Sequence, residues 1–279
     1  MSPADFDQWL LQDFRPPLVM GVLNVTPDSF SDGGKYATTD AAIARAEEIA
    51  DAGAHIIDIG GESTRPGAEP VSPDEQIRRV VPVLQAVAHR LPVLFSIDTT
   101  SSEVAQAALD AGAAIINDIS AGRDDPHILT LAGRKRCPII LMHMLGRPKT
   151  MQQAPHYEEV TPEVAGFLNE RIVTAGIHGV DLDRILLDPG IGFGKMRMHN
   201  LQLLRNLREL TVLGRPLVIG TSRKRFIGEI TGETDPDNRL FGTAATVAWS
   251  LANGASIVRV HDVEPMMKAV RIIQAIIES

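Results

Sequence analysis

The chain has 279 residues, of which 44% are hydrophobic and 22% charged, a composition typical of a protein that folds around a core. Its formal net charge of −8 argues against general nucleic-acid binding, which normally needs a basic surface. The single cysteine, Cys137, excludes an intrachain disulfide and a cysteine-rich metal site. No apolar run approaches the roughly 18 residues of a spanning helix, and the first residues lack a signal-peptide pattern, so we expect a cytoplasmic protein without a membrane segment.

Strand and helix patterns alternate along the whole chain after residues 1–15, which we interpret as a short N-terminal cap. Apolar runs predict strands near residues 18–23, 55–59, 93–97, 114–117, 139–142, 185–187, 217–220 and 256–260. Helical patterns lie between them, for example at residues 39–52, 73–89, 101–111, 162–175 and 238–252. The strands are uninterrupted apolar runs, as expected when both faces of a parallel sheet are buried. Eight such units predict a single (β/α)8 TIM-barrel domain spanning residues 1–279.

A repeated pattern supports this division. Residues 51–58, 110–117 and 253–262 each read as the end of a helix, a glycine, a short apolar strand and a polar residue. Glycine adopts the left-handed conformation that ends a helix without steric cost. We therefore expect Gly53, Gly112 and Gly254 to close three of the helices that precede strands.

Polar residues stand at nearly every predicted strand end. They are Asn24, Asp58, Asp98, Asn117, His143, Asp188, Thr221 with Ser222, and Arg259 with His261. In a barrel of this kind, the carboxyl ends of the strands converge on the catalytic face. A single residue of this kind could be a loop cap, but a ring of them predicts a functional site at the strand tips and the loops that follow.

Several members of this ring suit an anion. Residues 60–68 offer backbone donors, two hydroxyl groups and Arg65, and this set suits a phosphate. Lys224 follows a strand end, and Arg259 and His261 occupy alternate positions that share one strand face. Such residues could instead form a solvated charge run, and residues 24–34 could be an ordinary turn with a helix cap. Asn24 could complete a Mg²⁺ site, because Mg²⁺ takes few protein ligands beside water and phosphate oxygens.

The acidic and amide members suit a different partner. Asp98 and Asp188 can accept hydrogen bonds from adjacent N–H groups of a planar heterocycle, and the Asn117 amide can both donate and accept. The alternative for either aspartate is a structural helix cap. Taken together, the ring predicts a site for a nitrogen heterocycle attached to a phosphate group.

Seven motifs resemble those of the dihydropteroate synthase family, in the family order. They are residues 24–34 (NVTPDSFSDGG), 61–68 (GESTRPGA), 117–120 (NDIS), 142–144 (MHM), 188–195 (DPGIGFGK), 222–224 (SRK) and 259–262 (RVHD). The resemblance spans residues 18 to 263. It differs at Ile191, where many relatives carry phenylalanine.

The resemblance implies roles for individual residues. The implied catalytic residues are Arg65, Asp98, Lys224, Arg259 and His261. Pterin would be held by Asp98, Asn117, Met142, Asp188, Lys224 and Arg259. Diphosphate would be held by Asn24, Thr64, Arg65, Arg259 and His261, with Asn24 as the Mg²⁺ ligand. The p-aminobenzoate site would be framed by Phe30, Thr64, Pro66, Phe193, Ser222 and Lys224.

The resemblance also implies an activity and an assembly. The reaction would join p-aminobenzoate to a dihydropterin methyl diphosphate, with diphosphate departing before the arylamine attacks, and the protein would be a homodimer. Two alternatives stay open at the level of sequence. One is a pterin-binding methyltransferase of a corrinoid system, which has no need for diphosphate cations. The other is a homologue without catalytic activity.

Overall fold

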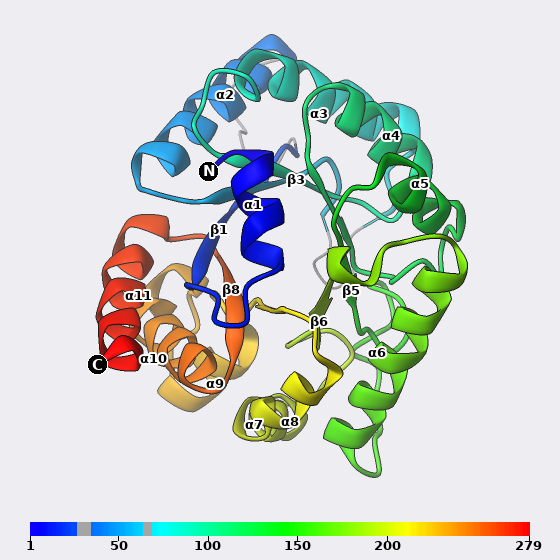
Figure 1. The fold of residues 1–279 in the computed structure, drawn as a ribbon. Helices are drawn as coiled ribbons and strands as arrows, with labels where there is room; N and C mark the ends of the chain where they lie inside the picture. The colour runs from blue at the N-terminus through cyan, green and yellow to red at the C-terminus, as the bar shows by residue number, and fades with distance from the viewer. Residues whose placement is uncertain (27–34, 64–68) are drawn as a thin grey trace.

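Eight parallel strands close into a barrel in which each strand pairs with its neighbours in the chain, and β8 pairs with β1 (Figure 1). The computed structural model describes residues 1–26, 35–63 and 69–279. The strands are β1 Leu18–Asn24, β2 Ile56–Gly60, β3 Leu94–Asp98, β4 Ile115–Asp118, β5 Ile139–Met142, β6 Ile185–Asp188, β7 Leu217–Ile219 and β8 Ala255–Val260. The predicted (β/α)8 barrel is confirmed.

Helix α1 lies across one end of the barrel, and the other helices surround the strands on the outside (Figure 1). They are α1 Pro3–Leu10, α2 Lys35–Asp51, α3 Pro73–Val87, α4 Ser102–Asp110, α5 His127–Lys135, α6 Val160–Ile177, α7 Arg197–Arg205, α8 Leu207–Leu210, α9 Arg225–Thr231, α10 Leu240–Ala252 and α11 Val263–Glu278. None of the helices within the described ranges is long and apolar enough to cross a membrane.

The observed boundaries differ from the predicted ones mostly by one or two residues. A larger difference lies at α2, which begins at Lys35 rather than residue 39. The helix predicted at residues 238–252 begins as α10 only at Leu240, because Pro236–Arg239 form a separate 3₁₀ turn capped by Asp235. Proline favours the first turn of such a segment, and the Asp235 side chain accepts the backbone N–H of Asp237. The glycines expected to end helices do so, since Gly53, Gly112 and Gly254 have φ values of 95°, 109° and 98°.

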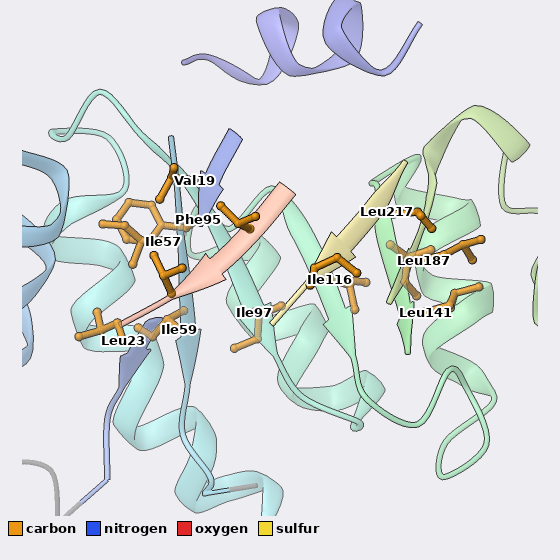
Figure 2. Close-up of a cluster of buried hydrophobic side chains, with 14 of the residues drawn as sticks. Val19, Leu23, Ile57, Ile59, Phe95, Ile97, Ile116, Leu141, Leu187 and Leu217 are labelled. Carbon is orange, nitrogen blue, oxygen red and sulfur yellow. The ribbon is translucent and has the colours of Figure 1, made fainter. Parts of the chain in front are cut away.

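Successive residues of each strand face opposite sides of the barrel wall. One set packs against the surrounding helices, and Figure 2 shows Val19, Ile57, Phe95 and Leu187 among its members. The other set fills the interior near the amino ends of the strands and includes Met20, Leu186 and Ile257. The strands are therefore apolar on both faces, which explains their uninterrupted hydrophobic pattern.

Helix α1 covers the amino end of the barrel. Its buried side chains, Phe6, Trp9 and Leu10, belong to the same apolar cluster as the interior residues of the strands. The rings of Phe6 and Trp9 stack with centroids 5.3 Å apart, and Trp9 Nε1 donates to the carbonyl oxygen of Pro16 at 2.8 Å. This end of the barrel is apolar and covered. Because the strands are parallel, their polar carboxyl ends lie together at the opposite end.

Candidate active site

A cavity opens at the carboxyl ends of the strands. It is lined by Asp98, Asn117, Ile119, Met142, Asp188, Ile191, Phe193, Gly220, Ser222, Lys224, Arg259 and His261. The lining comes from strands β3 to β8 or from the residues that follow them, as the polar strand ends predicted. Carboxylates and an amide lie beside cations and apolar side chains, so the cavity can accept a flat, polar and partly apolar ligand.

The base of this cavity is a charge cluster. Arg259 donates through Nε to Oδ2 of Asp58 at 2.6 Å, and through Nη2 to Oδ2 of Asp98 at 2.8 Å. Asn117 donates through Nδ2 to the same Asp58 oxygen at 3.0 Å. Asp58 is fully buried, and among the described residues its Oδ1 has no hydrogen-bond partner. The cluster fixes the Arg259 guanidinium between two carboxylates at the floor of the cavity.

The surroundings of Asp98 raise the pKa of its carboxyl group. Burial, together with the negative charge of Asp58, raises the pKa of Asp98 to about 7, although the Arg259 charge opposes that change. The neutral and ionised forms of this carboxyl are therefore close in free energy near neutral pH. A ligand that donates N–H groups to Asp98 would favour the ionised form.

Asp188 faces the same cavity from the end of β6. Its Oδ1 accepts the backbone N–H of Gly190 at 2.6 Å, which orients the carboxylate toward the lining residues. Burial raises the pKa of Asp188, while that hydrogen bond and the charge of Lys224 act in the opposite direction. Asp188 and Asp98 thus present carboxyl groups from two separate strands of one cavity wall.

Lys224 reaches the cavity from the turn after β7. Its Nζ lies 4.1 Å from the centroid of the Phe193 ring, within the range of a cation–π contact. Burial and then the charge of Arg259 lower the pKa of Lys224 to about 8, while Asp188 and Asp98 oppose the shift. The amine is therefore still mostly protonated near neutral pH.

His261 follows β8 and is held by Ser222. The Ser222 hydroxyl oxygen accepts the backbone N–H of His261 at 3.1 Å and lies 3.0 Å from the ring Nδ1. Burial, with the charges of Arg259, Arg223 and Lys224, lowers the pKa of His261 to about 3. The ring is therefore neutral at physiological pH. If the Ser222 hydroxyl donates to Nδ1, the ring proton sits on Nε2 and is available to an anion.

A wider cleft joins these residues to the end of β1. Asn24 and Ser63 line it together with Ser222, Arg259 and His261. Asn24 is half-buried, and among the described residues its side-chain amide has no hydrogen-bond partner. No group of three or more His, Cys, Asp or Glu side chains that could hold a metal exists within residues 1–26, 35–63 and 69–279. The Asn24 side-chain oxygen is of the kind that could contribute to a Mg²⁺ ion bound mainly by water and phosphate oxygens.

The cations of residues 222–225 are not equivalent. Arg223 has a left-handed backbone conformation with φ of 60°, and its guanidinium pairs with Asp262 at 2.6 Å and with Asp237. Its backbone N–H also donates to the Thr243 hydroxyl. Arg225 is exposed and pairs with Glu229. Of the three cations, only Lys224 lines the inner cavity.

The structure brings together most of the residues predicted for the site. Those lining the inner cavity are Asp98, Asn117, Met142, Asp188, Phe193, Ser222, Lys224, Arg259 and His261. Asn24 lies in the wider cleft that several of them share. The predicted residues Phe30, Thr64, Arg65 and Pro66 lie outside the described residues.

Sequence reasoning assigns no specific role to two residues, Asp58 and Lys195, that make central contacts in the structure. Asp58 was recognised as a strand-end residue, but its position beneath Arg259 and Asn117 depends on pairing between distant strands. Lys195 was noted only within the glycine-rich motif, and the structure buries it against His143. A lysine beside glycines gives no sequence signal for burial, so only the fold reveals this contact.

Comparisons with known proteins agree with this geometry. The model of a family described as pterin binding enzyme matches residues 20–261. A dihydropteroate synthase of Synechocystis is 47% identical over 98% of this chain and 95% of its own length. The structure of Xanthomonas albilineans dihydropteroate synthase with 4-aminobenzoic acid superimposes with a TM-score of 0.89, at 46% identity and 94% coverage of both chains. A structure of the Xanthomonas enzyme in complex with 7,8-dihydropteroate gives a TM-score of 0.86 at 43% identity, with 94% coverage of both chains.

The chain therefore belongs to the family of pterin-binding enzymes. Within that family, its relatives at 45–47% identity over nearly all of the chain are dihydropteroate synthases, and it is an enzyme of this group.

Proposed function

We propose that the chain joins 4-aminobenzoate to a (7,8-dihydropterin-6-yl)methyl diphosphate, giving 7,8-dihydropteroate and diphosphate in folate biosynthesis. The observation that carries this proposal is the inner cavity, where the carboxyl groups of Asp98 and Asp188 and the Asn117 amide lie beside Arg259 and His261. The first group suits the N–H edge of a pterin, and the second suits its diphosphate. The Xanthomonas relatives with 4-aminobenzoic acid and with 7,8-dihydropteroate support the same substrates.

The pterin would lie deepest in the cavity. Asp98, Asn117 and Asp188 are buried and would bond its ring edge, with Lys224 donating from the side. Met142, fixed at the tip of β5, and the Arg259 guanidinium would pack on the two ring faces. Because the carboxylates otherwise lack enough donors in their buried positions, pterin N–H groups would compensate their desolvation.

The diphosphate would lie toward the wider cleft. Arg259 and the neutral His261 would donate to its oxygens there, and Asn24 would face it from β1. We further propose Thr64 and Arg65 as diphosphate ligands on the resemblance of their motif. Mg²⁺ is proposed to be held by Asn24 with oxygens of the substrate, and when bound it would offset negative charge on the diphosphate.

The 4-aminobenzoate would occupy the outer part of the cavity. Phe193 offers an apolar ring there, while Ser222 and Lys224 lie next to it and can donate to a carboxylate or a forming product. Phe30, Thr64 and Pro66 complete this proposed set on the resemblance of their motifs. The pterin and 4-aminobenzoate would then meet beside Lys224, which lines both parts.

Catalysis would come from charge stabilisation and positioning. The bond between the pterin methylene carbon and the diphosphate oxygen breaks, and its electron pair leaves on diphosphate, whose charge Arg259 and His261 stabilise. The arylamine nitrogen then bonds to the methylene carbon and releases a proton to diphosphate or water. Holding the two substrates in one cavity supplies the alignment that this step needs.

A direct test measures diphosphate release from the pterin diphosphate with Mg²⁺, with and without 4-aminobenzoate, and identifies the product by mass. Release that depends on 4-aminobenzoate and gives 7,8-dihydropteroate is the expected result. Pterin binding without release, by folded protein, would favour a pterin-binding methyltransferase or a homologue without activity. Omission of Mg²⁺ in a parallel reaction tests the metal and should slow release.

We also propose that the enzyme is a homodimer, and that residues 1–279 form one domain. Helices α10 and α11 pack side by side and carry exposed apolar side chains, among them Phe241, Trp249, Ile272 and Ile276. A closed dimer with two-fold symmetry would cover such a surface. Sedimentation of the purified protein and of a Phe241→Glu variant tests it, since the variant should shift toward monomer. The cytoplasmic location stays a prediction.

A further inference from the structure

Lys195 is a buried cation without a carboxylate partner among the described residues. Only 2% of the residue is exposed, although lysine is almost never fully buried unless paired. Its Nζ lies 2.9 Å from His143 Nδ1, and donates to the carbonyl oxygens of Phe193 at 3.0 Å and His143 at 3.4 Å. Burial lowers the pKa of Lys195 to about 7, although the charge of Asp188 opposes that shift. Burying this amine among neutral acceptors is costly, and its contacts show what the burial achieves.

His143 is a fixed neutral acceptor for this amine. Burial and then the charges of Lys195 and Arg123 lower the pKa of His143 to about 2, so the imidazole stays neutral at any working pH. Its ring meets the Phe167 ring edge-on, with centroids 4.8 Å apart, and this contact holds it in place. Nδ1 therefore accepts from the ammonium, and His143 acts neither as an acid nor as a base for the reaction.

The contacts of Lys195 join two parts of the site. His143 directly follows Met142, the cavity residue at the tip of β5, whereas Phe193 lies in the connection from β6 to α7. That connection passes very close to β5, because a Cβ added to Gly190 would lie 1.9 Å from the His143 carbonyl oxygen. Lys195 belongs to the same connection, and its amine contacts both His143 and the Phe193 carbonyl oxygen. It is therefore a second tie between the connection and the tip of β5, placed at the residue whose ring enters the cavity.

The contacts of Lys195 also affect the part of the cavity that is proposed to bind 4-aminobenzoate. The Phe193 ring supports Lys224, whose Nζ lies 4.1 Å from the ring centroid. A Phe193 backbone that is free to shift would move both this ring and the cation that rests on it. Asn117 is held by Asp58 of β2 and Asp98 by Arg259 of β8, so neither depends on Lys195. Burial raises the pKa of Asp188 and the charge of Lys195 is a smaller opposing influence, so we expect loss of Lys195 to affect Asp188 less than Phe193.

We propose that Lys195 is a positioning residue for the 4-aminobenzoate half of the site, holding the Phe193 backbone against the tip of β5 so that the Phe193 ring stays beneath Lys224. This inference rests on the proposed function for its substrate. Lys195 would not touch either substrate. Its removal would weaken the use of 4-aminobenzoate while leaving the pterin cavity intact.

The test compares Lys195→Met, which keeps the length of the side chain without donors, with Tyr157→Phe as the matched control. Tyr157 also anchors this connection, through a 2.9 Å hydrogen bond from its hydroxyl to the Gly194 carbonyl oxygen, but it does not bond Phe193. Steady-state kinetics are measured with each substrate varied separately. Lys195→Met should raise the KM for 4-aminobenzoate by about tenfold, the effect of losing one buried hydrogen bond. Its KM for the pterin diphosphate should stay within about twofold of the wild type, a change too small to reflect loss of such a bond.

Tyr157→Phe should lower the melting temperature without changing either KM. Equal KM changes for both substrates in Lys195→Met, or the same 4-aminobenzoate effect in both variants, would overturn the proposal and leave a purely structural tie. If Lys195→Met does not fold, Lys195→Gln replaces it, because the amide can still donate to the Phe193 carbonyl; it should raise only the 4-aminobenzoate KM, and less than the loss of all donors would.

Hydrogen exchange gives a readout that does not need activity. The Phe193 amide, which donates to the Gly190 carbonyl oxygen at 3.0 Å, should lose protection in Lys195→Met or Lys195→Gln, while amides in β3 and β4 keep theirs. Unchanged protection of the Phe193 amide would overturn this inference even in an active enzyme. Wild-type protein that releases no diphosphate would instead contradict the proposed function.

Discussion

Arg259 and Asp58 form an ion pair of 2.6 Å although they are 201 positions apart in the chain. Arg259 lies near the end of β8 and Asp58 in the middle of β2, and β1 runs between these two strands. The same Asp58 oxygen also holds Asn117. One buried carboxylate thus orients a proposed diphosphate ligand and a proposed pterin ligand, and it does so from a place that the cavity does not reach.

This pair changes what replacement of Arg259 should do. From sequence, Arg259→Ala is expected to reduce pterin diphosphate turnover far more than stability. In the structure, the change leaves Asp58 and Asp98 buried without their cation, so we expect a loss of about 3–5 kcal/mol in the free energy of unfolding as well. Turnover should fall by about two to three orders of magnitude. Denaturant titrations and diphosphate release measure the two effects.

A double variant separates these effects. Adding Asp58→Asn to Arg259→Ala removes one unpaired charge, so it should recover part of the lost stability without recovering turnover. Unchanged turnover in Arg259→Ala would remove the phosphate role of this residue.

Asp98→Asn should abolish pterin binding and raise the stability of the protein near pH 8. The Asp98 carboxyl has a pKa of about 7 in the folded protein against 3.8 unfolded, so the folded state holds an extra proton between these values. Stability therefore falls as pH rises through that window. The variant should melt a few degrees above wild type near pH 8, and this difference should vanish below about pH 4. Calorimetry across pH measures it, and pterin binding by the variant should be lost. A variant that melts below wild type at both pH values would contradict the raised pKa.

His261 should act without titrating. Its pKa of about 3 leaves the ring neutral near neutral pH, so removing it should not change the shape of the pH profile of kcat/KM. His261→Ala should lower kcat/KM by about tenfold through loss of one hydrogen bond to the diphosphate. His261→Gln, which keeps an N–H donor, should lose less. A change in kcat/KM near pH 6.5 that is present in the wild type and absent from His261→Ala would show that the ring is charged during the reaction.

Arg223 should affect the reaction without entering the cavity. Its ion pairs with Asp262 and Asp237 hold the left-handed turn between Ser222 and Lys224. Arg223→Met should lower kcat/KM by about tenfold but stability by only about 1 kcal/mol, because the ion pairs are partly exposed. Arg225→Met is the matched control, since Arg225 is exposed and its ion pair among the described residues is with Glu229, and its kinetics should equal those of the wild type. Equal kinetics in Arg223→Met and Arg225→Met would show that the turn keeps its position without the ion pairs of Arg223.

Trp9→Ala tests the far end of the barrel. Trp9 is 3% exposed and packs with Phe6 into the interior cluster beneath the strands. Truncation should cost about 3–5 kcal/mol of unfolding free energy through the cavity that it leaves. Both KM values should stay unchanged when measured well below the melting temperature, because the cluster lies away from the site. A changed KM would show that the two ends of the barrel are coupled.

The sequence was most informative where one local pattern determines one local structure. The apolar runs predicted all eight strands within one or two residues, and six of the polar residues named at their ends line the inner cavity. Asp58 and His143 are instead buried outside it. Alternation along β8 correctly placed Arg259 and His261 in one cavity. These inferences need only the geometry of a strand and the direction shared by parallel strands.

Contacts between distant strands could not be predicted in this way. The Asp58 pair depends on the closure of the barrel, and the burial of Lys195 depends on the path of a connection between strands. In the charge run at residues 222–225 the sequence singles out Lys224 by its place after a strand end, but it does not reveal that Arg223 turns toward Asp262. The charge state of His261 was also missed, since it is set by burial and by three neighbouring cations rather than by residue type.

Helix α1 restricts the path by which substrates reach the site. Because it seals one end of the barrel, and the interior beneath the site is filled with apolar side chains, molecules can enter and leave only through the opposite mouth. Three of the proposed pterin ligands, Asp98, Asn117 and Asp188, are buried, whereas Phe193 and Lys224 are half-buried and lie nearer that mouth. A pterin that arrives second would have to pass an occupied 4-aminobenzoate position. We therefore expect ordered binding, in which the pterin binds first and the joined product leaves before the next pterin enters.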